Sequence, residues 1–290
     1  MSETGFPPAP RNQGRKLSHA PISAGAVLGG LLTGGLLVAA ILGQVATPYD
    51  PLALDFGARL APPGPGHWLG TDELGRDILS RLMRGASASA RIALLTTALA
   101  VAAGTLLGGL SGFFGGLFDR AAMTLNDAML AFPGLLMALG LLAVFGADET
   151  GIILALALAY SSGVARIVRG AVLSLRERAF VEASTAMGNS RLYTLLRHVL
   201  PNCLGPIIVM ATSMCGWVIL SESALSFLGL GVAPPAPTWG NMLAGGRSYF
   251  SQAPWLGIFP GLAISLALLG VNLLGDALRD RFDPRRGGRA

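Results

Sequence analysis

The stretch IALLTTALAVAAGTLLGGLSGFFGGLF, residues 92–118, contains no charged side chain. A helix needs about 20 mostly apolar residues to cross the roughly 30 Å hydrocarbon core of a bilayer. This stretch meets that requirement, so it predicts a membrane-spanning helix and points to an all-α membrane protein. Glycines recur in it at four-residue spacing, which lets neighbouring helices approach closely in lipid. They are Gly104, Gly108, Gly112 and Gly116.

Further uncharged runs occur on both sides of this stretch. The run at 223–246 contains Pro234, Pro235 and Pro237, which no single helix accommodates, so we expect a loop or re-entrant segment there. The other runs predict six membrane spans, near residues 22–45, 92–114, 122–145, 150–168, 203–221 and 255–274. The first span is longer than the apolar region of a signal peptide and lacks a clear cleavage site, so we expect an uncleaved anchor.

The composition supports a membrane protein. Of the 290 residues, 52% are hydrophobic and 13% are charged, against about 25% charged in soluble domains. The mean hydropathy is +0.59, which excludes a disordered chain. The two cysteines, Cys203 and Cys215, would lie roughly 18 Å apart on one helix, too far for a disulfide.

The basic residues predict the orientation in the membrane. Six spans place both termini on one side, and the positive-inside rule assigns the more basic side to the cytoplasm. With cytoplasmic termini, fifteen Lys and Arg lie inside and six outside. We therefore expect segments 46–85 and 222–254 outside and the 170–202 loop inside. Because the arginines border membrane spans, the net charge of +5 does not indicate a nucleic-acid partner.

The inside loop has the pattern of a helical hairpin. Residues 171–187 are good helix formers, Gly188 is suited to the left-handed residue that ends a helix, and Asn189 or Ser190 can cap the next helix. We expect Pro201 to close that second helix. Apolar side chains recur in it at helical spacing and predict one apolar face. They are Leu192, Leu195, Leu196 and Val199.

The first helix of this hairpin should expose a small apolar knob with one carboxylate, made by Phe180, Val181, Met187 and Glu182. Such a knob is suited to docking in a groove of another protein. The pattern equally fits an amphipathic hairpin that lies on lipid headgroups.

Glu182-Ala183-Ser184, Gly188 and the His198 to Pro201 segment together resemble the EAA loop of ABC importer permeases. This resemblance implies a type I ABC importer transmembrane domain over residues 21–290, preceded by a cytoplasmic tail at 1–20. It also implies that the loop is a coupling helix that docks on a separate ATPase subunit. The family usually has a second alanine where this chain has Ser184. The implied coupling residues are Phe180, Glu182, Ala183, Gly188, His198 and Pro201.

A second motif resembles the segment before the second span in the C-type permeases of dipeptide, oligopeptide and nickel importers. Its residues are Gly70, Thr71, Asp72, Gly75, Arg76 and Asp77. Physically it predicts a glycine turn, an aspartate cap at Asp72 or Asp77, and a short helix on which Asp77 and Arg81 are four residues apart. The resemblance extends over about residues 20–285.

The resemblance also implies the partners. It implies a homologous B-type permease, one or two ATPase subunits that bind ATP and Mg, and an extracytoplasmic substrate-binding protein, in the inner membrane of a bacterium or archaeon. Dipeptides or oligopeptides are the expected cargo, with nickel, glutathione or another small solute as alternatives.

The chain itself lacks the signatures of an enzyme. Its single lysine, Lys16, precedes Leu17, so it has no phosphate-binding loop of the Walker type. The three histidines fall in different segments without metal-ligand spacing, and we expect no catalytic residue, metal or resident cofactor.

An ion-coupled secondary transporter is the alternative outside the family. Such transporters place carboxylates within the membrane. Asn126 and Asp127 are the candidates, either lining a pathway or forming a polar helix end that faces Arg120 or water. Trp68, Trp239 and Trp255 fall at expected outer boundaries, as an aromatic belt would.

Overall fold

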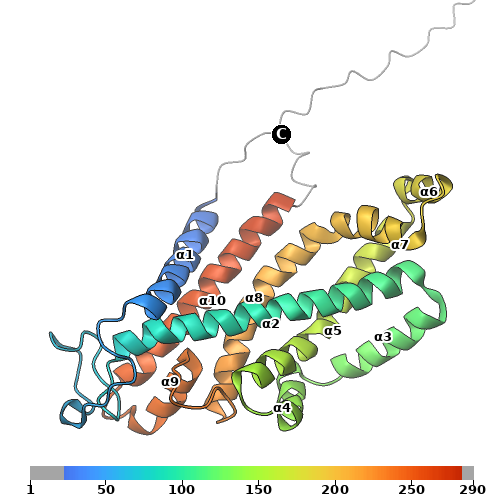
Figure 1. The fold of residues 1–290 in the computed structure, drawn as a ribbon. Helices are drawn as coiled ribbons and strands as arrows, with labels where there is room; N and C mark the ends of the chain where they lie inside the picture. Colours follow the sequence, from blue (N-terminus) through green and yellow to red (C-terminus); the bar gives the residue numbers. More distant parts are fainter. Residues whose placement is uncertain (1–22, 283–290) are drawn as a thin grey trace, which may run out of the picture.

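The computed structural model describes residues 23–282, which form a bundle of helices without a β-strand (Figure 1). The expected tail at 1–20 and the first residue of the first span, Ile22, lie outside the described residues. Five of the helical segments in this range are long and apolar enough to cross a membrane, as the uncharged runs predict. The all-α polytopic fold is therefore confirmed.

The five long helices are α1 (Ala24–Val45), α2 (Ile78–Phe114), α5 (Glu149–Arg176), α8 (Leu204–Phe227) and α10 (Trp255–Phe282). Four of them extend beyond the spans that the uncharged runs predict, and only α1 does not. Helix α2 begins well before residue 92 because Asp77 caps its first turn and its early charged residue Arg81 is buried. Charged residues therefore do not mark the ends of these helices when other parts of the chain neutralise them.

The third expected span, 122–145, is not one helix. It consists of α3 (Gly116–Leu130) and α4 (Gly134–Phe145), which meet at an angle of 98°. Pro133 lies at the break with extended backbone (ψ 128°), because a proline has no N–H to continue the helical ladder. The described residues therefore contain six spans only if this bent pair counts as one.

Glycines hold the two central helices together. Helices α2 and α5 form the most extensive contact in the bundle. A Cβ added to Gly104 would lie 2.6 Å from the carbonyl oxygen of Ser161, and one added to Gly108 would collide with the carbonyl oxygen of Ala165. A Cβ on Gly112 would approach α5 to 3.0 Å. The predicted packing role of these three glycines is confirmed, because a Cβ would clash at Gly104 and Gly108 and would make an unusually close contact at Gly112.

Gly116 and the glycines of α1 behave differently. Gly116, with φ +67°, has nothing within 4 Å of an added Cβ and lies at the turn between α2 and α3. In α1, Gly29 packs against the backbone of Leu274 in α10, whereas Gly30, Gly34 and Gly35 have open space beside them.

Short elements gather at the two ends of the bundle (Figure 1). We call residues 46–77 and 228–254 the cap; it contains η1 (Phe56–Ala58), α9 (Trp239–Gly246) and η4 (Arg247–Tyr249). We call residues 179–203 the hairpin; it contains α6 (Ala179–Ala186), α7 (Arg191–Thr194), a π-helical turn η2 (Leu195–Val199) and η3 (Leu200–Cys203). Helix α1 leads into the cap and α10 leads out of it, so their other ends lie at the opposite end of the bundle, as the hairpin does.

Candidate docking sites at the two ends of the bundle

The hairpin turns on Gly188, as the sequence predicts. Its φ of +83° is left-handed, and its N–H donates to the carbonyl of Thr185 at 3.0 Å. The N–H of Asn189 donates to the carbonyl of Ser184 at 3.3 Å, so both bonds close the end of α6. Ser190 then caps α7 by accepting from the N–H of Tyr193 at 3.2 Å. The predicted helix over 171–187 is instead interrupted after α5, before α6 begins at Ala179.

Polar bonds hold the two arms of the hairpin together. The hydroxyls of Ser184 and Thr194, both buried, form a hydrogen bond of 2.9 Å. Nδ2 of Asn189 donates to Oγ of Ser184 at 3.2 Å. Val181 and Leu195 are buried beside them. The prediction that Val181 is exposed is therefore wrong, because it faces inward with Ser184 three residues along the helix. The serine at the family's alanine position makes bonds that an alanine lacks.

The outward face of α6 combines exposed apolar side chains with one carboxylate, and we call it the knob. Met187 is 74% exposed and Phe180 is 40% exposed, with the side chains of Glu182 and Ala183 also exposed. The small side chains around Glu182 leave its carboxylate prominent on a helix of eight residues. The face presents apolar area and one negative charge, which suits a groove in another protein.

The second arm differs from its prediction. Pro201 does not close a helix: it lies in the first turn of η3, where a missing N–H is tolerated, and the chain continues directly into α8. The predicted apolar face is only half buried, with Leu192 and Leu196 exposed, because the π-helical turn changes the register of the side chains. His198 is partly buried and lies edge-on to the ring of Tyr193, with centroids 5.8 Å apart.

Three contacts between residues that are distant in the sequence stabilise the hairpin end of the bundle. The guanidinium of Arg191 lies 5.8 Å from the ring centroid of Phe114, the last residue of α2. Nη1 of Arg176 donates to the carbonyl oxygen of Gly112 at 3.1 Å. Arg169 of α5 makes two bonds to Asp119 of α3, at 2.6 and 2.7 Å. The first contact joins the hairpin to α2, and the other two join α5 to α2 and to α3.

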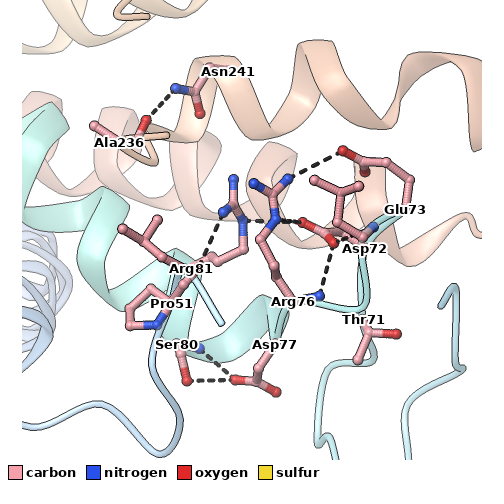
Figure 2. A network of polar contacts seen from close by, with 12 residues as sticks. Pro51, Thr71, Asp72, Glu73, Arg76, Asp77, Ser80, Arg81, Ala236 and Asn241 are labelled. Carbon is pink, nitrogen blue, oxygen red and sulfur yellow. Dashed lines mark hydrogen bonds and ion pairs between the residues drawn. The ribbon is translucent and has the colours of Figure 1, made fainter. Parts of the chain in front are cut away.

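The second motif forms the centre of the cap. Asp72 is buried; its Oδ1 accepts from the N–H groups of Leu74 and Arg76, at 2.8 and 3.0 Å, and its Oδ2 accepts from Nε of Arg76 at 2.6 Å. Arg81 pairs with Asp72 at 3.4 Å (Figure 2). Asp77 instead caps α2, accepting from the N–H and hydroxyl of Ser80 at 2.8 and 2.7 Å. The spacing of Asp77 and Arg81 therefore did not indicate their partners.

The other motif residues fix the loop around this centre. Gly70 and Gly75 have φ of +80° and +77°, and a Cβ on Gly75 would collide with the carbonyl oxygen of Asp55. Thr71 donates to the carbonyl of Ala58. Its own carbonyl accepts from Nε1 of Trp255 at 3.1 Å. The six motif residues thus form one unit of the cap.

The three tryptophans expected at outer boundaries differ in their surroundings. Trp239 is buried and its Nε1 donates to the carbonyl oxygen of Leu82 at 3.0 Å, which ties α9 to α2. Trp255 is likewise bonded to the cap, and of the three only Trp68 is highly exposed, at 71%. Trp239 and Trp255 therefore also join separate parts of the chain through hydrogen bonds.

Sequence reasoning missed the role of Glu222. This side chain is 1% exposed, and its Oε1 accepts from the hydroxyls of Ser226 and Thr238, both at 2.9 Å. Its Oε2 is buried and has no hydrogen-bond partner among the residues that the structure describes. Because Thr238 caps α9, Glu222 joins α8 to the cap. The available signal was a glutamate between two serines in an apolar segment, which spacing alone does not connect to Thr238.

The polar pair in α3 separates onto two faces. Asn126 is 1% exposed and its Nδ2 donates to the carbonyl of Ser162 in α5 at 3.2 Å. Asp127 is 60% exposed and pairs with Arg166 at 2.6 Å, rather than with the expected Arg120. Neighbouring residues on a helix point about 100° apart, so one packs inward and the other outward.

These features define a polytopic membrane subunit with a braced hairpin at one end and a polar cap at the other. The sequence pattern of the binding-protein-dependent transport system inner membrane component family matches residues 104–288, and the chain belongs to this family. It is a permease subunit of an ABC importer with a type I transmembrane domain, located in the inner membrane. The family implies ATPase and substrate-binding partners.

The chain is also similar to curated permeases along most of its length. A putative peptide transport system permease of Brucella suis is 41% identical over 89% of this chain and 87% of the relative. A dipeptide transport system permease of Alkalihalophilus pseudofirmus is 38% identical over 90% of this chain and 86% of the relative. A glutathione transport system permease of Pectobacterium atrosepticum is 39% identical over 90% and 87%. The resemblance seen in the motifs is confirmed.

Proposed function

We propose that this chain is the C-type subunit of a peptide importer, paired with a homologous B-type permease. Similar proteins named for peptide, dipeptide and glutathione transport support a peptide cargo. The excess of basic residues over segment 166–197 and at both termini supports a cytoplasmic hairpin and an outside cap.

The observation that carries this proposal is the construction of the hairpin. It presents Glu182 with Phe180 and Met187 on a short helix, and its inner face is fixed by Ser184 and Thr194. In our proposal one or two ATPase subunits, which bind ATP and Mg, dock on this knob. His198 and Pro201 lie on the arm that connects the knob to α8.

Transport then follows from differential binding. ATP performs work only if the closed ATPase pair binds the outward-open permease more tightly than the inward-open one. The hairpin transmits that preference to α2 through the contact of Arg191 with Phe114, and the bond from Arg176 of α5 to Gly112 ties α2 to α5. The chain acts as a gate without catalytic residues, and the cap receives the extracytoplasmic binding protein.

Replacing Glu182 by alanine tests the hairpin's role. We expect transport-coupled ATP hydrolysis by the reconstituted importer to fall about tenfold, since a hydrogen bond to a charged group contributes about 1.5–3 kcal/mol. Subunit abundance in the membrane should not change, because Glu182 is exposed. Glu177→Ala, which removes an exposed charge just before α6, is the matched control and should leave coupling intact. Equal coupling in both variants would contradict docking through Glu182.

A further inference from the structure

Arg76 of the cap and Arg81 of α2 meet on one carboxylate (Figure 2). Nε of Arg76 lies 2.6 Å and Nε of Arg81 lies 3.4 Å from Oδ2 of Asp72, so the two guanidinium groups are side by side. Nη1 of Arg81 donates to the carbonyl oxygen of Pro51 at 3.2 Å. Nη2 of Arg76 donates to Oε1 of Glu73, also at 3.2 Å. One carboxylate thus holds two cations together in a largely buried place.

Each guanidinium retains an unused end beside a cavity. Within residues 23–282, Nη1 of Arg76 and Nη2 of Arg81 have no hydrogen-bond acceptor. A cavity of about 30 Å³ lies against both side chains and is closed on another side by Asn241 and Gly245 of α9. A water needs roughly 10–15 Å³ measured in this way. The cavity therefore admits a group as small as one carboxylate, which is the natural acceptor for paired guanidinium donors.

Glu73 is the most exposed of the four charged residues in this cluster and is held by fewer bonds than Asp72. Its side chain is 22% exposed, compared with 6% for Asp72, and its contact with Arg76 is a single bond. Asp72, by contrast, also accepts from two backbone N–H groups. When Glu73 turns outward, two arginines face one aspartate, and an uncompensated positive charge remains at the cavity.

We propose that this cavity is a docking site for one acidic side chain of the extracytoplasmic binding protein, and that Glu73 is an internal carboxylate which this side chain displaces from Arg76. The inference rests on the proposed function, because it requires the cap to face the outside. The cavity shares no residue with the larger apolar groove of about 220 Å³ between α5 and α8, and it is too small for a peptide. Its occupant is therefore the tip of a protein side chain rather than the cargo.

A docking site and a purely structural cluster predict different effects of removing the Glu73 charge on binding of the partner. If the four charged residues only fasten the cap, removal of the Glu73 charge weakens the cap or changes nothing. If Glu73 competes with an incoming carboxylate, its neutralisation leaves Arg76 more available and tightens binding of the partner.

The test uses the complete importer in lipid nanodiscs, with the purified cognate binding protein loaded with a dipeptide as the probe. We expect Glu73→Gln to lower the Kd for the binding protein roughly two- to fivefold, the range for a partly exposed ion pair that no longer competes. Addition of Arg76→Gln to this variant should abolish the gain. Glu149→Gln is the matched control: it removes a glutamate from an exposed Arg91 pair, 2.6 Å long, at the start of α5, and should leave the Kd unchanged.

Every other result of this experiment contradicts a specific part of the proposal. An unchanged or higher Kd for Glu73→Gln, with wild-type binding intact, overturns the docking site while the proposed function stands. A gain that persists in the Glu73→Gln, Arg76→Gln double variant also overturns it. A gain that disappears when the loaded dipeptide carries a carboxy-terminal amide assigns the cavity to the cargo and overturns the protein-side-chain occupant. If the wild-type importer does not bind the binding protein, the proposed function fails, and this inference fails with it.

Discussion

Replacing Gly108 by leucine is expected to prevent stable folding of the permease. A Cβ at this position would collide with the carbonyl oxygen of Ala165, so α2 and α5 would have to separate along their whole contact. Overpacking of a core typically costs about 1–3 kcal/mol, and a clash with a rigid helix backbone belongs at or above the upper end of that range. We expect the variant to be nearly absent from membranes and to lose its cooperative thermal unfolding transition in detergent.

The control for this prediction is Gly30→Leu. Gly30 is a glycine of α1, and nothing lies within 4 Å of an added Cβ there. The same substitution should therefore leave abundance and Tm of the chain close to those of the wild type. If Gly108→Leu accumulates and unfolds like Gly30→Leu, the close contact between α2 and α5 is wrong.

Replacing Gly188 by valine should uncouple the importer without removing it from the membrane. Gly188 has φ +83°, a conformation that costs most L-residues about 1–2 kcal/mol and a β-branched residue more. The strain would open the bonds of Gly188 to Thr185 and of Asn189 to Ser184, which position α6. We expect ATP-driven uptake to fall more than tenfold, and co-purification with the ATPase to be reduced.

The added side chain itself meets no neighbour, since nothing lies within 4 Å of a Cβ on Gly188. The defect should therefore come from backbone conformation alone. Gly188→Asn separates the two causes, because asparagine adopts the left-handed region readily, and it should retain most of the uptake. Normal uptake by the valine variant, or an equal loss with asparagine, would contradict this account of the turn.

The bilayer made much of the fold predictable from the sequence. It demands long apolar helices, and the runs that predict spans one, two, four, five and six all lie in such helices. The break before α4 was visible only as Pro133, because a membrane helix can tolerate a proline when neighbouring groups satisfy its backbone. Helices continue beyond the ends of the uncharged runs at positions where a charged residue is paired. Arg81, which pairs with Asp72, is an example.

The hairpin was predictable because its signals are local. Gly188 and Ser190 act on residues within a few positions of themselves, so the turn and the cap follow from sequence. The burial of Val181 was not local, because it depends on how α6 packs on the second arm. The prediction from the apolar spacing of Leu192 and Leu196 failed where the π-helical turn altered the helical period.

The cap was the least predictable part because its bonds join distant residues. Trp255 reaches Thr71, Trp239 reaches Leu82, and Glu222 reaches Thr238. Tryptophans at expected membrane boundaries therefore had the same sequence pattern as interface anchors. The motif that includes Asp72 indicated where the cap centre lies, but not that Arg81 shares its carboxylate.

Uptake of a radiolabelled dipeptide into vesicles that contain the complete importer tests the central claim most directly, namely that this chain is a passive gate driven through its hairpin by a separate ATPase. The account predicts uptake that requires both ATP and the binding protein and persists after proton and sodium gradients are collapsed. Uptake driven by an ion gradient in the absence of ATP would contradict it.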